Sequence, residues 1–298
     1  MPPPPPLRFL SAWFCPFAQR AQIALEARGV PYEFVESLGW DHHADDITWH
    51  HWKSEELLQH SAAGLIPTLV EPGEGGRAVG ESLVVLELVD ELAGESDGAP
   101  LLPADPWRRA EARRAAEWCN KRICSEYYNI LVQREPEEQA AAFGRMRDAI
   151  IEFTTNAGSF KEGFRGPLFD GERLTVVDCA LAPHALRFFV LAHWRGSAFA
   201  LPRADPQLAQ WHVWLDAVRA HPAVVASMVR AHAHTHARAC VAACVAAVDG
   251  QPSLVQPENF EERYLAHSRK YADGAARSKV AQAVRAGRAA HEIDVSTA

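Results

Sequence analysis

Cys15, followed directly by Pro16, is the residue in this sequence with the most specific signal for nucleophilic chemistry. Pro16 suits the first position of a helix and Gly29 the position just past its end, so the sequence predicts a helix over 16–28 that Cys15 caps. The unpaired amides and the dipole at that end favour a negatively charged sulfur, and the thiolate is the form that attacks disulfides. The alternative is a small buried apolar residue, the commoner role for a cysteine thiol.

The chemistry open to Cys15 is limited by its neighbours. The residue three positions later is Ala18, so the motif contains no second cysteine and a dithiol cycle within it is excluded. Resolution of a mixed disulfide on Cys15 therefore requires an external thiol. Ser11 could activate a bound thiol, but it precedes the cap and is the weaker candidate.

Two other motifs could hold a small peptide-like ligand. Pro67 follows the β-branched Ile66 and precedes an expected strand, which is consistent with a cis bond that would open the backbone of Ile66 to an extended peptide; a trans proline at the start of an edge strand is the alternative. Glu81 and Ser82 lie at the turn into a helix. They could bind the ammonium and carboxylate of an amino-acid head group, or Ser82 could simply be the N-cap.

These residues must be positioned by the strands and helices around them. The sequence pattern of those elements predicts an α/β domain followed by a helical one. The chain opens β-α-β with parallel strands around the first helix, continues through a polar loop at 39–53, and ends the domain with a hairpin and a helix at 81–94. The expected strands are 7–11, 30–36, 66–71 and 77–80. A proline-rich linker at 95–106 separates this domain from segments with helical periodicity. The expected helices there are 107–133, 137–157, the helix after 174, 206–219 and the segment from 223 onward.

The length, net charge and composition of the chain exclude several classes of function. The chain has 298 residues and a formal net charge of −8, which argues against nucleic acid as a partner. No apolar run is expected to reach the ~18 residues of a membrane span, and the MPPPPPLR start lacks the pattern of a signal peptide. The cysteines show no zinc-site spacing and fit a reducing compartment, so a cytoplasmic protein is expected. They are Cys15, Cys119, Cys124, Cys179, Cys240 and Cys244.

Two histidine clusters suggest metal binding, but the plainer interpretation is favoured for both. His232, His236 and Cys240 are spaced four apart and would share one face of a helix, with no carboxylate near them. The cluster at 42–51 is expected to be a solvated loop. No metal is therefore expected.

Together these motifs resemble the glutathione transferases. The string CPFAQR, which begins at Cys15, is similar to the omega class, whose nucleophile is cysteine. The stretch LTVVDCALAP at 174–183 resembles the buried capping box of that superfamily, with Thr175 capping a helix and Asp178 returning the bond. Two later segments also resemble the family, the penultimate helices at 204–224 and, at 270–289, the C-terminal tails of fungal omega-like members.

The resemblance implies a fold and a set of site residues. The implied fold is a thioredoxin-like α/β domain at 1–94, a linker at 95–106, an all-helical substrate domain at 107–248, and a tail at 249–298 packed on the helical domain. Cys15 would form the mixed disulfide with glutathione. The implied glutathione-binding residues are Phe14, Pro16, Lys53, Ile66, Pro67, Glu81 and Ser82. Candidates for the second-substrate pocket, chosen by position, are Trp118, Arg122, Tyr127, Tyr128, Trp211 and Trp214.

Two departures from the family pattern fall close to this site. The loop before Lys53 is rich in histidine and tryptophan, and Ser61-Ala62-Ala63 replaces the usual Asn-Pro. The function implied is a glutathione-dependent thiol transferase acting on small electrophilic or disulfide substrates, with dehydroascorbate reduction and removal of glutathione from conjugates as related reactions. A homodimer is expected. The alternative is a carrier of glutathione or apolar ligands, or an interaction module, with the same fold and no useful turnover.

Overall fold

The computed structural model describes residues 5–42, 49–94, 98–155, 164–228, 260–276 and 278–290, which belong to two compact units. The first unit comprises Met1–Pro100 and Pro222–Phe260, together with Val295–Ala298. The second comprises Leu101–His221 and Glu261–Asp294. Each unit has its own core.

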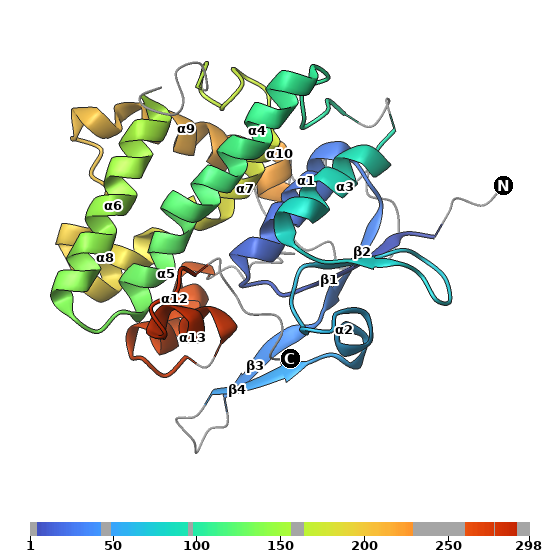
Figure 1. Ribbon diagram of the computed structural model, residues 1–298, viewed down its shortest axis with the longest axis horizontal. Helices are drawn as coiled ribbons and strands as arrows, with labels where there is room; N and C mark the ends of the chain where they lie inside the picture. The colour runs from blue at the N-terminus through green and yellow to red at the C-terminus, as the bar shows by residue number, and fades with distance from the viewer. Residues whose placement is uncertain are drawn as a thin grey trace, which may run out of the picture. The chain divides into compact units, whose positions relative to one another are not determined.

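A four-stranded sheet in the order β2-β1-β5-β6 forms the centre of the first unit (Figure 1). Strands β1 and β2 are parallel, with helix α1 as their crossover, while β5 runs antiparallel to both β1 and β6. The expected order β-α-β, then β-β-α, is therefore present. In chain order the elements are β1 (Leu7–Ser11), α1 (Pro16–Arg28), β2 (Tyr32–Glu36), β3 (Leu38–His42), β4 (Trp49–Lys53), α2 (Glu55–His60), β5 (Thr68–Val70), β6 (Ala78–Val79), α3 (Ser82–Leu92) and α10 (Pro222–Ser227).

Helix α1 begins and ends where its sequence predicts. Cys15 is the N-cap, Pro16 is the first helical residue, and Gly29 takes a left-handed conformation (φ 62°) at the C-cap. The amide of Gly29 lies 3.4 Å from the carbonyl of Glu26. A proline without an amide donor and a glycine without a side chain are suited to these two ends.

The two faces of the sheet are covered by different helices. Leu57 of α2 packs with Leu10 and Val70 in one buried cluster, against which Val35 and Ile66 also pack. Helices α1 and α3 lie side by side, as Figure 1 shows. The sheet is therefore a buried layer, and its strand ends and connecting turns are the parts of the unit left to carry functional groups.

The segment expected to be a loop at 39–53 is in large part a β-hairpin. Strands β3 and β4 pair antiparallel, and Gly39 lies opposite Trp52, whose indole fills the space that a side chain on Gly39 would need. Residues 43–48 lie outside the described part. Tryptophan is a strong strand former, which helps to explain why a segment with little alternation still pairs.

The start of the linker is tied to the first unit by Arg28, the last residue of α1. Its guanidinium forms an ion pair with Asp90 of α3 at 2.9 Å and donates to the carbonyl of Gly98. Both charged side chains are less than 10 % exposed. The guanidinium also lies 3.5 Å from the carbonyl of Gly94. Burying one partner of the Arg28–Asp90 pair alone would cost several kcal/mol, so the pair holds the guanidinium where it contacts Gly94 and Gly98.

The second unit is helical. Its elements are α4 (Pro106–Cys119), the π-helical segment η1 (Asn120–Cys124), α5 (Ser125–Val132), α6 (Pro136–Thr154), α7 (Val176–Ala185), α8 (Phe189–Arg195), the 3₁₀ turns η3 (Ser197–Phe199) and η4 (Pro206–Leu208), α9 (Ala209–Ala220), α12 (Phe260–Ala272) and α13 (Lys279–Arg285). The single helix expected over 107–133 is thus interrupted by a wide turn. There the hydroxyl of Ser125 donates to the carbonyl of Asn120 at 3.0 Å.

A buried carboxylate organises the core of the second unit. Asp178 accepts bonds from the amide and the hydroxyl of Thr175, at 2.9 and 2.7 Å. It also accepts bonds from the indole of Trp214 at 2.9 Å and the amide of Phe169 at 3.0 Å. Burial raises the pKa of Asp178, although these hydrogen bonds act to lower it. The capping box expected from Thr175 and Asp178 is present at the start of α7.

The described part of the expected C-terminal tail consists of two helices. Tyr264 and Lys270 of α12 are 3 % and 1 % exposed, and burial lowers the pKa of Lys270 well below its usual value. The hydroxyls of Tyr264 and Tyr127 lie 3.2 Å apart and share a hydrogen bond. Helix α12 is therefore part of the core of the second unit.

Helix α10 differs from the expected domain division. The boundaries 107–248 would place it with the helical domain, but it belongs to the first unit and packs on α1. The side-chain Nε2 of Gln19 donates to the hydroxyl of Ser227 at 3.1 Å, and both residues are buried. Apolar spacing identifies α10 as a helix but does not show which core it joins.

One described stretch, Val176–Arg195, is long and apolar enough by length and composition to cross a membrane. This corrects the expectation that no run reaches that length. Of its most apolar window, 83 % is buried inside the second unit. The apolar side chains are thus used in packing, as in the central helix of many globular domains.

Candidate functional site

Cys15 lies in a tight turn between β1 and α1. Its amide donates to the carbonyl of Ala12 at 3.0 Å, and its own carbonyl accepts the amide of Gln19 at 3.0 Å, the first hydrogen bond of the helix. The backbone of Cys15 is extended (φ −80°, ψ 113°) and the residue is half-buried. The thiol is therefore at the positive end of a 13-residue helix and accessible to a small molecule.

A carboxylate that sequence reasoning missed holds this turn. The amide of Trp13 donates to Oε1 of Glu36, the last residue of β2, at 3.2 Å. The indole of Trp13 meets the ring of Phe14 edge-on, with 5.7 Å between centroids. Phe14 is buried, so of the two expected flanking residues Phe14 supports the turn and Pro16 starts the helix.

The loop that leads into β5 has the backbone geometry considered for it. The Ile66–Pro67 peptide bond is cis. Around it the hydroxyl of Thr68 donates to the carbonyl of Leu65 at 2.8 Å, and the hydroxyl of Ser61 accepts the amide of Leu65 at 3.0 Å. The side chain of Ser61, in the Ser61-Ala62-Ala63 segment, thus holds the backbone of this loop.

Glu81 and Ser82 occupy the start of α3, one position away from the expected capping arrangement. Glu81 is the N-cap and has a positive φ of 65°, while Ser82 is the first helical residue. A positive φ at a residue that is not glycine is uncommon and frequently marks a functional position.

A buried arginine lies behind this helix start. The guanidinium of Arg20 donates to the hydroxyl of Ser82 at 3.1 Å and is 5.0 Å from the centroid of Phe17. Arg20 is 1 % exposed. Sequence reasoning missed it, because the buried face of α1 also carries other polar residues, among them Gln19 and Gln22.

Lys53 is exposed at the end of β4 and lies over the loop before Ile66. Its ammonium donates to the carbonyl of Ala63 at 3.3 Å. Gly64 has a φ of +55°, and a Cβ there would come within 2.5 Å of Nζ of Lys53. The ammonium is thus near the backbone of Ala63 and Gly64.

The residues proposed for a second-substrate pocket have mixed positions in the second unit. Four are core residues with exposures of 5 % or less, namely Tyr127, Tyr128, Trp211 and Trp214. Trp214 is committed to Asp178, and Trp211 stacks on Phe188 with 6.0 Å between centroids. Only Trp118 and Arg122 remain at least partly exposed, with the guanidinium 5.9 Å from the indole centroid. The helical spacing of aromatic residues in the sequence therefore does not distinguish side chains that pack in the core from side chains that line a pocket.

Within the described residues, no group of three or more His, Cys, Asp or Glu side chains is placed to hold a metal ion. The cluster of His232, His236 and Cys240 lies outside those residues, and the side chains of the 42–51 cluster also lie outside the described part.

Known proteins match both the sequence and this geometry. A model of the glutathione S-transferase N-terminal domain matches residues 14–92. A probable glutathione S-transferase, GSTU6 of Oryza sativa subsp. japonica, is 30 % identical over 223 residues, which cover 74 % of this chain and 88 % of that protein.

Solved structures match the fold over most of its length. Glutathione transferase Omega 3C from Trametes versicolor is 25 % identical, with a TM-score of 0.61 over 83 % of this chain and 94 % of its own. Rice GST1 (OsGSTU1), solved in complex with glutathione, is 25 % identical, with a TM-score of 0.60 over 89 % and 97 %. Both Omega and Tau structures match at this identity, so the omega class that CPFAQR suggested is not established.

These likenesses confirm the expected architecture, a thioredoxin-like sheet domain joined to a helical one. The alignment with the rice relative that is 30 % identical covers most of both chains. A match of this extent shows a family relationship and not a likeness of fold alone. The chain belongs to the glutathione S-transferase family.

Proposed function

We propose that this chain is a glutathione-dependent thiol transferase that works through Cys15. The observation that carries the proposal is a half-exposed cysteine at the N-cap of a 13-residue helix, in the domain that matches the glutathione-binding half of the family. A thiolate there is favoured by the helix dipole and the first-turn amides. A cysteine reacts itself, whereas a serine or tyrosine would activate a bound thiol.

The reaction proceeds by two thiol–disulfide exchanges. The Cys15 thiolate attacks the glutathione sulfur of a mixed disulfide, forms a new S–S bond to it, and displaces the other thiol, which takes up a proton. A second glutathione, as its thiolate, then attacks the glutathione sulfur held on Cys15. Glutathione disulfide leaves, and Cys15 returns as the thiolate.

The neighbouring residues would hold the tripeptide. The backbone of Ile66, before the cis Pro67, pairs with its cysteine; Glu81 takes the γ-glutamyl ammonium; and Ser82 with the start of α3 binds the γ-glutamyl carboxylate. Lys53 takes the glycine carboxylate. The rice structure solved with glutathione supports this ligand for a protein of the same fold. Mixed disulfides of glutathione are the substrates of the exchange described above. With an S-phenacyl-type conjugate, Cys15 would attack the same glutathione sulfur and the ketone would leave as an enolate that takes up a proton. Dehydroascorbate would take two electrons and two protons from the thiols of Cys15 and glutathione, which are left as their mixed disulfide.

Intact mass measurement after incubation with glutathione disulfide tests this function. Wild type should gain one glutathionyl group, which a reductant removes, and Cys15→Ser should gain none. Cys119→Ala is the matched control, because Cys119 is fully buried and should not react. An unmodified wild type that still binds apolar ligands would support the carrier without turnover.

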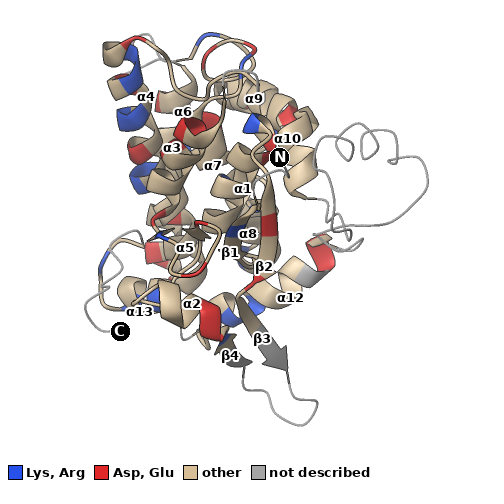
Figure 2. Ribbon diagram, turned by 90° about the vertical axis from the view of Figure 1, so that its right-hand side faces the viewer, with Lys and Arg blue, Asp and Glu red and all other residues tan. Residues whose placement is uncertain are grey.

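Assembly and location follow as further parts of the proposal. Helix α3 exposes Val84, Glu91 and Leu92, and α4 exposes Trp107. Lys and Arg residues are frequent along α4, as the blue segments of that helix show (Figure 2). The α3 surface of one copy would suit the α4 surface of a second in a homodimer. Thiols at Cys15, Cys119, Cys124 and Cys179 fit a reducing, cytoplasmic setting.

A further inference from the structure

The turn that carries Cys15 is fixed by a side chain from the neighbouring strand. The turn runs from Ala12 to Cys15, and its closing hydrogen bond joins the amide of Cys15 to the carbonyl of Ala12 at 3.0 Å. The amide of Trp13 is directed out of the turn and donates to Oε1 of Glu36 at 3.2 Å. Glu36 therefore bonds to the backbone two residues before the thiol.

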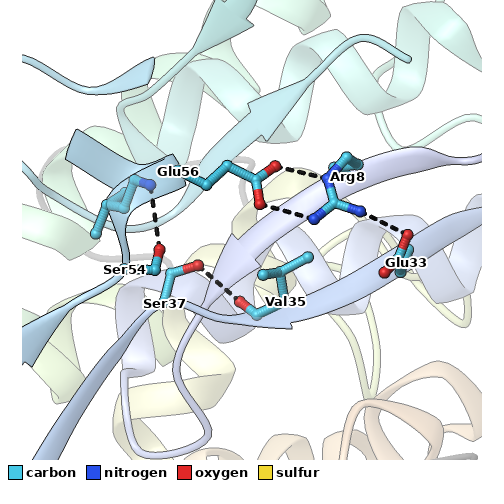
Figure 3. Close-up of polar contacts among 7 residues, drawn as sticks. Arg8, Glu33, Val35, Ser37, Ser54 and Glu56 are labelled. Carbon is cyan, nitrogen blue, oxygen red and sulfur yellow. Dashed lines mark hydrogen bonds and ion pairs between the residues drawn. The ribbon is translucent and has the colours of Figure 1, made fainter. Parts of the chain in front are cut away.

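The end of β2 is a rigid support for that carboxylate. Glu36 lies opposite Ser11 in the parallel register of β1 and β2, and the next amide, of Ser37, donates to the carbonyl of Ser11 at 2.8 Å. Ser37 is fully buried, and its hydroxyl donates to the carbonyl of Val35 at 3.0 Å (Figure 3). Its carbonyl accepts the amide of Ser54 at 2.9 Å.

Two effects of Glu36 on the thiol follow from this placement. Its hydrogen bond keeps the turn in the shape that presents Cys15 at the N-cap, where amides and dipole favour the thiolate. Its negative charge acts in the opposite direction, because a like charge nearby disfavours the ionised sulfur. The first effect depends on an acceptor oxygen and the second on charge, so substitutions can separate them.

We propose that Glu36 is a positioning residue for Cys15, which holds the thiol at the helix cap and sets the pH at which it ionises. The proposal rests on the proposed function in taking Cys15 as the reacting group. It adds a residue that acts through the backbone of Trp13 and not by contact with substrate.

The pH profile of Cys15 alkylation by iodoacetamide, in the full chain, tests the proposal. Glu36→Gln keeps an acceptor oxygen and removes the charge, so its midpoint should fall below that of wild type. Below the midpoint its alkylation should be about three- to tenfold faster, as expected for the removal of one nearby charge in a partly screened site. Glu36→Ala also loses the acceptor, so its midpoint should lie above that of Glu36→Gln.

The order of these midpoints decides the outcome. If Glu36→Ala and Glu36→Gln share one midpoint, the turn does not depend on the hydrogen bond and the positioning role is overturned. A midpoint for Glu36→Gln equal to that of wild type overturns the effect of charge. Thermal unfolding of each variant serves as a control. It checks that the chain remains folded, so that a shifted midpoint is not caused by unfolding.

Glu33→Gln is the matched control. Glu33 is on the same strand, but its carboxylate pairs with Arg8 at 2.8 Å, so this variant should keep the wild-type midpoint. Failure of the proposed function gives a different result, since wild type would then form no adduct with glutathione disulfide. The order of alkylation midpoints would still decide the role of Glu36.

Discussion

At the scale of single residues, the groups most tightly specified by local sequence were the easiest to predict. Pro16 and Gly29 fix the two ends of α1, and so they fix Cys15 at its cap without reference to the rest of the fold. Glu36 and Arg20 were missed because each acts on a residue far away in the chain, Glu36 on Trp13 and Arg20 on Ser82. Hydrogen bonds between residues so far apart in the chain cannot be predicted from the spacing of residues within one element.

Gly64 allows Lys53 to reach the loop before Ile66, and this gives a prediction for glutathione binding. Gly64→Ala adds a Cβ where Nζ of Lys53 now lies and also strains a positive φ. We expect a several-fold rise in the KM for glutathione with a smaller change in kcat, measured by steady-state kinetics.

Lys53→Met serves as the companion variant for Gly64→Ala. Loss of one exposed charge–carboxylate contact is worth about 1 kcal/mol, or roughly fivefold in affinity. If Gly64→Ala acts by displacing Lys53, it should add little in the Lys53→Met background. A full additional loss in the double variant would mean that Gly64 acts through the backbone of the loop.

At the scale of elements, the strands of the four-stranded sheet and helices α1 and α3 of the first unit were predicted, whereas the β3–β4 hairpin and helix α2 were not. In this hairpin the indole of Trp52 lies over Gly39 on the opposite strand, and the sequence lacks the short turn that marks most hairpins. The helical unit shows the opposite difficulty. The spacing of apolar residues predicted helices in this unit. The same spacing could not show that Tyr127 and Trp214 are core residues and not pocket residues.

The ion-pair network of β1, β2 and α2 gives the sheet a dependence on pH. Arg8 makes a two-point contact with Glu56 of α2, at 2.6 and 2.7 Å, and a third with Glu33 (Figure 3). The hydrogen bond to Arg8 lowers the pKa of Glu56 below its usual value. The stabilisation is therefore present above the unfolded pKa, ~4.3, and is lost as pH falls through the folded one.

Glu56→Gln should accordingly lower the free energy of unfolding by about 1 kcal/mol at pH 7, since the pair is partly exposed and screened. The gap to wild type should close as the pH falls below 4. Urea unfolding followed by tryptophan fluorescence at both pH values checks this. Glu71→Gln, which breaks the exposed pair with Arg77, should change stability less at pH 7. A gap for Glu56→Gln that is constant with pH would contradict the ion-pair account.

At the scale of the whole molecule, each of the two units combines segments that are far apart in the sequence. The first takes in α10, which the expected division placed with the helical domain, and the second takes in α12 and α13, which were expected as part of a tail packed on that domain. Arg195 of α8 shows how closely α12 is joined to its unit. Its guanidinium donates to the carbonyls of Leu131 and Ala272, the first at the end of α5 and the second at the end of α12.

If α12 is part of the core, truncating one of its buried side chains should be costly. Tyr264 lies under the guanidinium of Arg187, 4.9 Å from the ring centroid, and is hydrogen-bonded to Tyr127. Tyr264→Ala should lower the free energy of unfolding of the second unit by about 3 kcal/mol. Tyr264→Phe, which removes only the shared hydrogen bond, should cost about 1 kcal/mol. Losses below about 0.5 kcal/mol in both variants would mean that α12 is only loosely attached.

The wide turn at Asn120–Cys124 has a consequence for how this chain can be aligned with others. A π-helical turn holds one residue more than an α-helical one, and each added residue rotates the following side chains by about 100°. Tyr127 and Tyr128 face the core because that extra residue is accommodated here. A chain one residue shorter between 119 and 125 could run as an unbroken α-helix and keep both faces in place. A single-residue gap at this point of a sequence alignment therefore indicates a change in helical pitch. The core contacts of the side chains that follow can be the same in both chains.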